Sequence, residues 1–162
     1  MSLATKCCLG LASGFCLILL LAQRPSPISS ILGQIASGKL DPGPVVVEYR
    51  DLHAMHGGLN LTIRGTGEVE QEAVRAPVGQ AKRVSGDDLL RLVRLLSTQQ
   101  VWQQRIPQRT PVPDESRAYL TVRYREDRAE IWEWYNDLEK NRRILPIREL
   151  MKQIAWQSPP LR

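Results

Sequence analysis

The chain has 162 residues, of which 43% are hydrophobic and 24% charged, and its formal net charge is +5. These fractions are typical of a globular protein with one sizeable core, and they exclude a disordered chain and a polytopic membrane protein. The 22 Lys and Arg residues are interspersed with 17 Asp and Glu residues rather than gathered in a block, so we expect no nucleic-acid partner.

The first 22 residues have the pattern of a secretory leader. A short basic stretch at 1–6 precedes an apolar run at 7–22. This run is shorter than the roughly 20 residues that span a bilayer, which predicts a signal peptide or, if it is retained, an N-terminal membrane anchor. Ala22 favours cleavage, whereas Leu20 and Arg24 favour retention. We therefore expect the domain to be exported across, or anchored in, a cytoplasmic-type membrane, on its periplasmic, lumenal or extracellular side.

All three cysteines, Cys7, Cys8 and Cys16, lie inside this leader. A cleaved product would contain no thiol. Disulfide bonds, thiolate zinc sites and cysteine nucleophiles are then excluded from the exported domain.

Residues 23–44 are rich in Pro, Ser and Gly and are predicted to be a linker. Within it Ile28, Ile31, Leu32 and Ile35 fall at i, i+3, i+4 and i+7, so one short amphipathic helix is possible there. Such a helix would pack back on the domain or lie against a membrane beside the leader. The absence of Lys and Arg before Lys39 favours packing on the domain.

Residues 45–157 are predicted to form a single domain, followed by a tail at 158–162. A β-branched run at 45–50, an alternating segment at 59–64 and a Glu-rich segment at 68–74 predict three strands, with Gly65 and Gly67 in the turn between the last two. Ser85 and Asp88 mark the start of a helix whose apolar residues repeat with helical spacing. A Pro-rich surface connection at 105–116, a hairpin at 118–135 and a helix led by Pro146 follow.

This order of elements, β-β-β-α-β-β-α, lacks a regular βαβ alternation. It predicts an α+β fold in which an antiparallel sheet of about five strands carries two helices packed on one face.

The second hairpin carries the strongest binding signal. With a two-residue loop at 126–127, Thr121 lies opposite Trp132 and Tyr119 lies opposite Trp134, so both tryptophans point away from the aliphatic face. Together with Arg123 they form an aromatic and cationic surface typical of a binding hot spot. A three-residue loop would shift the register by one and place both tryptophans in the core.

His53 and His56, the only histidines, share a loop with Asp51, Gly57 and Gly58. Asp51 and the two histidines are potential metal ligands, which leaves a metal-dependent hydrolase as one alternative. A His-x-x-His in a Gly-rich bend is more often a solvated turn, and no Gly-x-Ser-x-Gly nucleophile motif is present. We therefore expect no enzyme, no metal and no cofactor, and we assign His53, His56, Gly57 and Gly58 to a partner-binding surface.

A wider pattern covers residues 45–156: a strand, a Gly-rich loop, an alternating strand, a Gly turn, a Ser-x-x-acid helix, a hairpin and a Pro-led final helix. It is carried by Tyr49, His56-Gly57-Gly58, Leu59-x-Leu61-x-Ile63, Gly65-x-Gly67, Ser85-x-x-Asp88-Leu89, Pro146 and Leu150. On these residues the domain resembles a group of small bacterial exported domains of unknown function and is similar to emfourin-like domains, the family of the protealysin inhibitor. That resemblance implies a protein that blocks the cleft of a thermolysin-type metalloprotease.

From the residues themselves we expect a non-enzymatic binding or assembly module with a protein partner at or near a membrane. Protease inhibition and metal-dependent hydrolysis are the alternatives.

Overall fold

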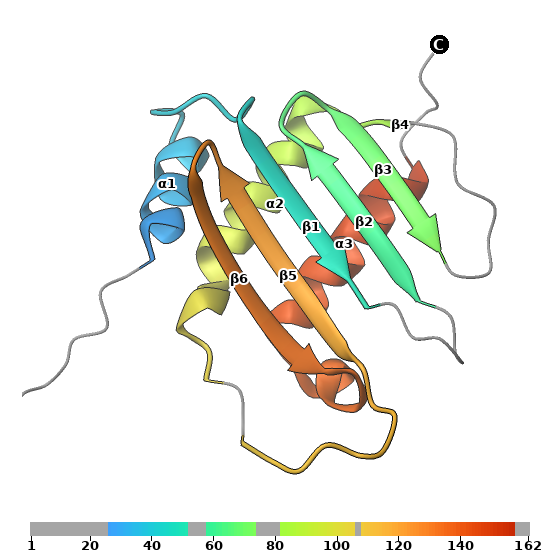
Figure 1. The fold of residues 1–162 in the computed structure, drawn as a ribbon. Helices are drawn as coiled ribbons and strands as arrows, with labels where there is room; N and C mark the ends of the chain where they lie inside the picture. The colour runs from blue at the N-terminus through green and yellow to red at the C-terminus, as the bar shows by residue number, and fades with distance from the viewer. Residues whose placement is uncertain (1–25, 52–57, 74–81, 106–107, 158–162) are drawn as a thin grey trace, which may run out of the picture.

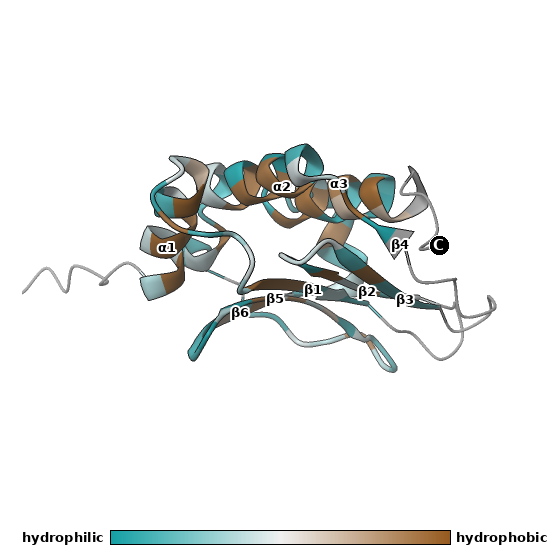
Figure 2. Cartoon of the chain, turned by 90° about the horizontal axis from the view of Figure 1, so that it is seen from above, coloured by the Kyte–Doolittle hydropathy of each residue, from teal (hydrophilic) through white to brown (hydrophobic). Residues whose placement is uncertain are grey.

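The computed structural model describes residues 26–51, 58–73, 82–105 and 108–157. Its elements are α1 (Pro27–Ala36), β1 (Val45–Arg50), β2 (Leu59–Arg64), β3 (Glu68–Ala73), β4 (Lys82–Arg83), α2 (Gly86–Gln99), η1 (Val101–Gln103), β5 (Arg117–Tyr124), β6 (Asp127–Trp134), η2 (Tyr135–Lys140) and α3 (Ile144–Gln157). The strands form one antiparallel sheet in the order β4-β3-β2-β1-β5-β6, and the α-helices lie on one side of it (Figures 1 and 2). The α+β prediction is confirmed, and the short β4 and the helix α1 add to it.

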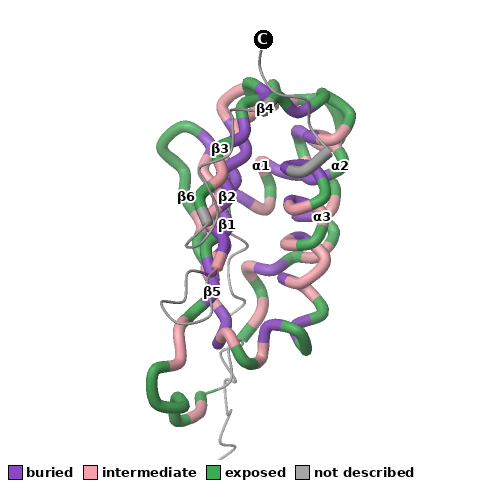
Figure 3. The backbone as a smooth tube through the Cα atoms, turned by 90° about the vertical axis from the view of Figure 1, so that its right-hand side faces the viewer, coloured by how far each residue is buried: buried purple, intermediate pink, exposed green. Residues whose placement is uncertain are grey.

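The core lies between the sheet and the helices, where Figure 3 shows the buried segments of the two layers facing each other. Alternation in β1 directs Val47 and Tyr49 into this space, and both are fully buried. Helical spacing in α2 directs Leu92 and Leu96 into it from the other side, also with no exposed surface. The predicted periodicities therefore produce one shared core.

The prediction of a linker at 23–44 is wrong for the residues that form α1. Ile28, Leu32 and Ile35 are at most 1% exposed and belong to the main core. Their helical spacing gives α1 an apolar side, which contacts α2, β5 and β6. The folded domain therefore includes α1 and begins well before Val45. Of the two placements expected for such a helix, packing on the domain is confirmed.

The other α-helices begin at polar capping residues. The Ser85 side chain accepts a hydrogen bond of 3.1 Å from the Asp88 N–H, which confirms the predicted start of α2. The Asn141 side chain accepts hydrogen bonds from the N–H groups of Arg143 and Ile144, so α3 begins slightly before Pro146. None of the described helices is long and apolar enough to cross a bilayer, and the leader lies outside the described residues.

Gly65 allows the β2–β3 turn to lie against the chain that precedes β1. Its N–H donates a 2.7 Å hydrogen bond to the carbonyl of Val45. A Cβ at this position would lie 1.9 Å from the backbone oxygen of Pro42, which is far inside van der Waals contact. Only glycine fits there without displacement of the 42–43 backbone.

The β5–β6 hairpin has a register that differs from both predicted ones. Its loop is Arg125 and Glu126, so Tyr119 lies opposite Trp132 and Arg117 lies opposite Trp134. The loop begins one residue earlier than predicted because Arg125 takes a positive φ of 52° and reverses the chain there. Each residue of β6 therefore pairs with the β5 residue two positions before the predicted one, so its side chain stays on the predicted face of the sheet. The prediction that both tryptophans point away from the aliphatic face is confirmed, and the core alternative is wrong.

Candidate binding face of the sheet

The side of the sheet that faces away from the helices carries the candidate site, and we call it the open face (Figure 2). Residues reach it by alternation in β1, β2, β5 and β6, whose other residues point into the core. No described helix covers it. Its members on these strands include Glu48, Arg50, Asn60, Thr62, Arg117, Tyr119, Thr121, Arg123, Arg128, Glu130, Trp132 and Trp134.

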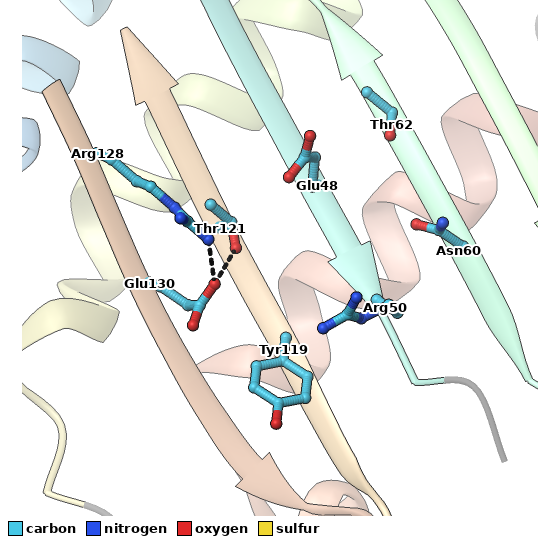
Figure 4. A pocket seen from close by; sticks show the side chains of 8 residues that line it. All are labelled: Glu48, Arg50, Asn60, Thr62, Tyr119, Thr121, Arg128 and Glu130. Atoms are coloured by element: carbon cyan, nitrogen blue, oxygen red, sulfur yellow. Dashed lines mark hydrogen bonds and ion pairs between the residues drawn. The ribbon is translucent and has the colours of Figure 1, made fainter. Parts of the chain in front are cut away.

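A hollow of about 270 Å³ lies in the middle of the open face, over β1, β2, β5 and β6 (Figure 4). Its lining is polar and consists of Glu48, Arg50, Asn60, Thr62, Tyr119, Thr121, Arg128 and Glu130. Both carboxylates are held in place by neighbours. Glu130 accepts hydrogen bonds from Arg128 at 2.6 Å and Thr121 at 3.0 Å, and Glu48 pairs with Arg123. The hollow thus has fixed polar walls.

Arg50 differs from the other arginines that border the hollow. Its guanidinium lies 4.9 Å from the centre of the Tyr119 ring, its direct cross-strand neighbour, in a cation–π contact. It has an ion pair with no carboxylate of the described residues. Arg50 is also exposed, so it presents a cation to any group that enters the hollow.

A row of stacked arginines and tryptophans extends the open face toward η2. The Arg117 guanidinium lies 4.1 Å from the Trp132 ring centre and 4.9 Å from that of Trp134, and the two indoles meet edge to face at 5.1 Å. The Arg109 guanidinium also stacks on Trp134, at 5.1 Å from its ring centre. Trp134 is consequently only 7% exposed, whereas Trp132 is half-buried and Arg117 is exposed. Trp132 and Arg117 form the accessible part of this row.

Arg109 holds the connection between η1 and β5 against this row. Its guanidinium donates to both oxygens of Glu115, at 2.7 and 2.8 Å, and its Nε donates to Asp137 at 2.7 Å. The hydrogen bonds from Arg109, with backbone N–H donors that include that of Asn136, lower the pKa of Glu115 to about 2. The carboxylate raises the pKa of Arg109 in turn. This cluster fixes Trp134 rather than offering a free charge.

Asp51, one of the three potential metal ligands, is engaged in a buried network instead. Its carboxylate accepts hydrogen bonds from the Tyr49 hydroxyl at 2.7 Å and the Leu59 N–H at 2.7 Å, and it pairs with Arg148 at 3.2 Å. Burial, reinforced by the Asp51 charge, raises the pKa of the Tyr49 hydroxyl, which stays a donor. Because both Asp51 oxygens are occupied, this carboxylate ties β1 to β2 and α3. The described residues contain no group of His, Cys, Asp and Glu arranged to hold a metal ion.

The predicted site residues divide into two sets. Tyr119, Arg123, Trp132 and Trp134 share the open face as expected, with Trp134 largely covered. His53, His56 and Gly57 lie outside the described residues, and Gly58 is a half-buried residue directly before β2. Arg50, Arg117 and Arg128 are among the arginines of the face that were not predicted as site residues. Alternation along each strand is the signal that could have found them, because residues an even number of positions apart lie on the same face. Arg50 is two residues from Glu48, Arg117 is two from Tyr119, and Arg128 is four from Trp132.

Comparison of the chain with protein-family models, with curated proteins and with solved structures finds no match. Function is therefore inferred from the residues of the fold and of its open face.

Proposed function

We propose that this protein is a non-enzymatic binding module, exported across or anchored at a membrane, that binds an acidic surface of a protein partner through its open face. One observation carries the proposal: the sheet face left uncovered by the described helices presents Arg50 and Tyr119 at a polar hollow, and the Trp132–Arg117 stack lies next to Tyr119. Aromatic and arginine side chains are those that contribute most to protein interfaces.

The charges on the β1, β5 and β6 part of the open face support an acidic partner there, whereas β3 adds Glu68, Glu70 and Glu72 at the opposite edge. On β1, β5 and β6 it carries four arginines, at 50, 117, 123 and 128, and two glutamates, at 48 and 130. The two glutamates are already paired with Arg123 and Arg128. Arg50 and Arg117 are left with aromatic contacts alone among the described residues, so a partner carboxylate would supply their missing counter-charge.

The same arrangement supports a role in recognition. The two carboxylates of the hollow each form an ion pair with a neighbouring arginine, an arrangement that fixes the charges a partner would meet. The leader at 1–22 supports a location on the outer side of a membrane. The resemblance to emfourin-like domains makes a secreted or membrane-associated protease one candidate partner.

Capture from solubilised membranes tests the proposal. A tagged chain is compared with Arg50→Glu and with Arg94→Glu, a matched charge reversal at an exposed position of α2 on the opposite side of the sheet. We expect the parent chain and the Arg94 variant to retain a partner and Arg50→Glu to lose it, since a charge-assisted hydrogen bond is worth about 1.5–3 kcal/mol. Failure of the parent chain to retain any partner contradicts the proposal, as does equal retention by Arg50→Glu.

The inhibitor form of this function has its own assay. Peptide hydrolysis by a thermolysin-type metalloprotease is measured at increasing concentrations of the parent chain and of the two variants. Inhibition that Arg50→Glu weakens and Arg94→Glu does not would identify the protease as a partner of the open face. Full protease activity at excess protein rules this form out and leaves the membrane capture to decide the rest.

A further inference from the structure

Strand β6 forms one edge of the sheet. Its hydrogen-bonding pattern with β5 shows which of its backbone groups point away from β5. The Tyr135 N–H donates to the carbonyl of Ser116 at 3.1 Å, directly beyond the last β5–β6 pair. Hydrogen-bonded pairs in an antiparallel ladder recur at every second residue. The backbone groups of 127, 129, 131 and 133 therefore face β5, and those of Arg128, Glu130 and Trp132 face the open edge.

Two observations agree with this pattern. The Trp134 N–H, next in the outward set, donates at 2.8 Å to the Glu133 carboxylate, which satisfies the edge at its C-terminal end. The N–H groups of Arg128, Glu130 and Trp132 have no such acceptor among the described residues. Within the part of the chain that the structure describes, these three outward residues thus leave their main-chain donors and acceptors unpaired over about 13 Å of strand.

A groove of about 470 Å³ lies along this edge. It is lined by five consecutive β6 residues, from Arg128 to Trp132, and by Ser26, Trp102, Gln104 and Gln108. Because the lining includes Ile131, which points to the helices, and Trp132, which points to the open face, the groove spans both sides of the edge. This is the space that a neighbouring strand at about 4.8 Å would occupy.

The walls of the groove favour a single strand over a second copy of the domain. Helix α1 lies beside the first part of β6 and extends past the sheet edge in both views (Figures 1 and 2). Ser26, its N-cap, and Trp102, in η1, line the groove on that side. A second copy paired edge to edge would bring its own α1 into the same space, whereas one extended segment carries no helix layer with it.

The side chains along the edge define the chemistry of such a segment. On the helix side it would meet Ile131, which is 7% exposed, and Trp102, so apolar residues fit there. On the open face it would meet the Arg128–Glu130 ion pair and the Trp132–Arg117 stack. Arg117 has no carboxylate partner among the described residues, so acidic residues fit there. Strand addition combines these alternate side-chain contacts with main-chain hydrogen bonds.

We propose that the β6 edge accepts an extended segment of the partner as a seventh, antiparallel strand, in which apolar residues facing the helices alternate with acidic residues facing outward. This inference rests on the proposed function and specifies how the partner is bound. Residues that pair directly in an antiparallel ladder share a face. The acidic residues of the segment therefore direct their N–H groups at Arg128, Glu130 and Trp132, and its apolar residues direct theirs away.

Synthetic peptides of alternating Val and Glu test this pairing without any change to the protein. One form is N-methylated at the Glu amides and its matched control at the Val amides. With peptide up to about 1 mM, we expect the unmodified and Val-methylated forms to slow hydrogen exchange at the amides of Arg128, Glu130 and Trp132, and the Glu-methylated form to bind at least tenfold more weakly. The proposal is overturned if the unmodified peptide protects none of these amides, or if the two methylated forms bind equally.

A protein variant links the edge to the natural complex. Glu130→Pro removes an outward N–H but no β5–β6 hydrogen bond, and Glu130→Ala controls for loss of the carboxylate. We expect a further tenfold loss of partner or peptide on going from Ala to Pro. If Arg50→Glu releases the captured partner but Glu130→Pro binds it as tightly as Glu130→Ala does, strand addition at the β6 edge is contradicted. The proposed binding function of the open face is then still supported. If no partner is captured at all, the proposed function fails, and the peptide titration alone decides whether the edge accepts a strand.

Discussion

Leu32→Ala in α1 tests whether the segment before β1 is part of the folded domain. Leu32 is 1% exposed and lies in the main core. The substitution removes three carbon atoms, which at about 0.8 kcal/mol each lowers the free energy of unfolding by about 2.4 kcal/mol. The cavity left between α1 and the neighbouring elements collapses only in part and adds to this loss, so we expect about 3 kcal/mol.

The measurement is equilibrium unfolding in urea, followed by tryptophan fluorescence and by far-UV circular dichroism. Ser30→Ala, at an exposed position of the same helix, is the control, and its effect should stay within about 0.5 kcal/mol. A linker helix that is only loosely attached would give the two variants the same small effect. Equal stability of Leu32→Ala and Ser30→Ala would therefore refute the assignment of α1 to the core.

Three further substitutions have expected effects that follow directly from contacts in the structure. Gly65→Ala should lower the unfolding midpoint strongly because its Cβ meets backbone at 1.9 Å, whereas Gly86→Ala, with open space around the new methyl group, should not; equal midpoints would contradict this. Asp51→Ala should cost about 2–4 kcal/mol in urea unfolding because it leaves the buried Tyr49 hydroxyl and the Leu59 N–H without their acceptor, while Arg148 keeps Glu149; a loss below about 1 kcal/mol would show that the network is not essential. The pKa of Glu115 is lowered in the folded state, so its contribution is fully present above about pH 4.5 and is lost as the pH falls through about 2. Glu115→Gln should therefore make the free energy of unfolding less dependent on pH in that interval, as measured by urea unfolding at a series of pH values. If this pH dependence is unchanged, the Arg109–Glu115 ion pair does not stabilise the fold.

The error at residues 23–44 shows where local composition misleads. Pro and Ser residues on both sides of α1 are typical of a linker, and they outweigh a helical repeat of four apolar residues, at 28, 31, 32 and 35, of which three are buried. The repeat itself was recognisable in the sequence. What composition could not show is that α2, β5 and β6 leave an apolar space of matching size beside them, because that space forms only when distant segments pack.

The hairpin illustrates the opposite case, in which a wrong detail left the conclusion intact. The turn was expected at 126–127 but lies at 125–126, since Arg125 adopts a positive φ that sequence statistics do not favour for arginine. Both loops contain two residues, so the side chains keep their faces and only their partners change. Because side chains alternate with a period of two, the face on which a residue lies can be predicted from the sequence more reliably than its cross-strand partner.

The composition of the candidate face could be read from alternation, but its assembly could not. Each strand alone shows which residues share a side, so the outward positions of Arg50 on β1 and Tyr119 on β5 were accessible from the sequence. Their contact arises from the β1–β5 pairing, which joins segments separated by β2, β3, β4 and α2. The same pairing places the glutamates of β3 near one edge of the open face and the arginines of β5 and β6 near the other. The charge asymmetry that favours an acidic partner at the β6 edge is therefore a product of strand order, which no local pattern in this chain encodes.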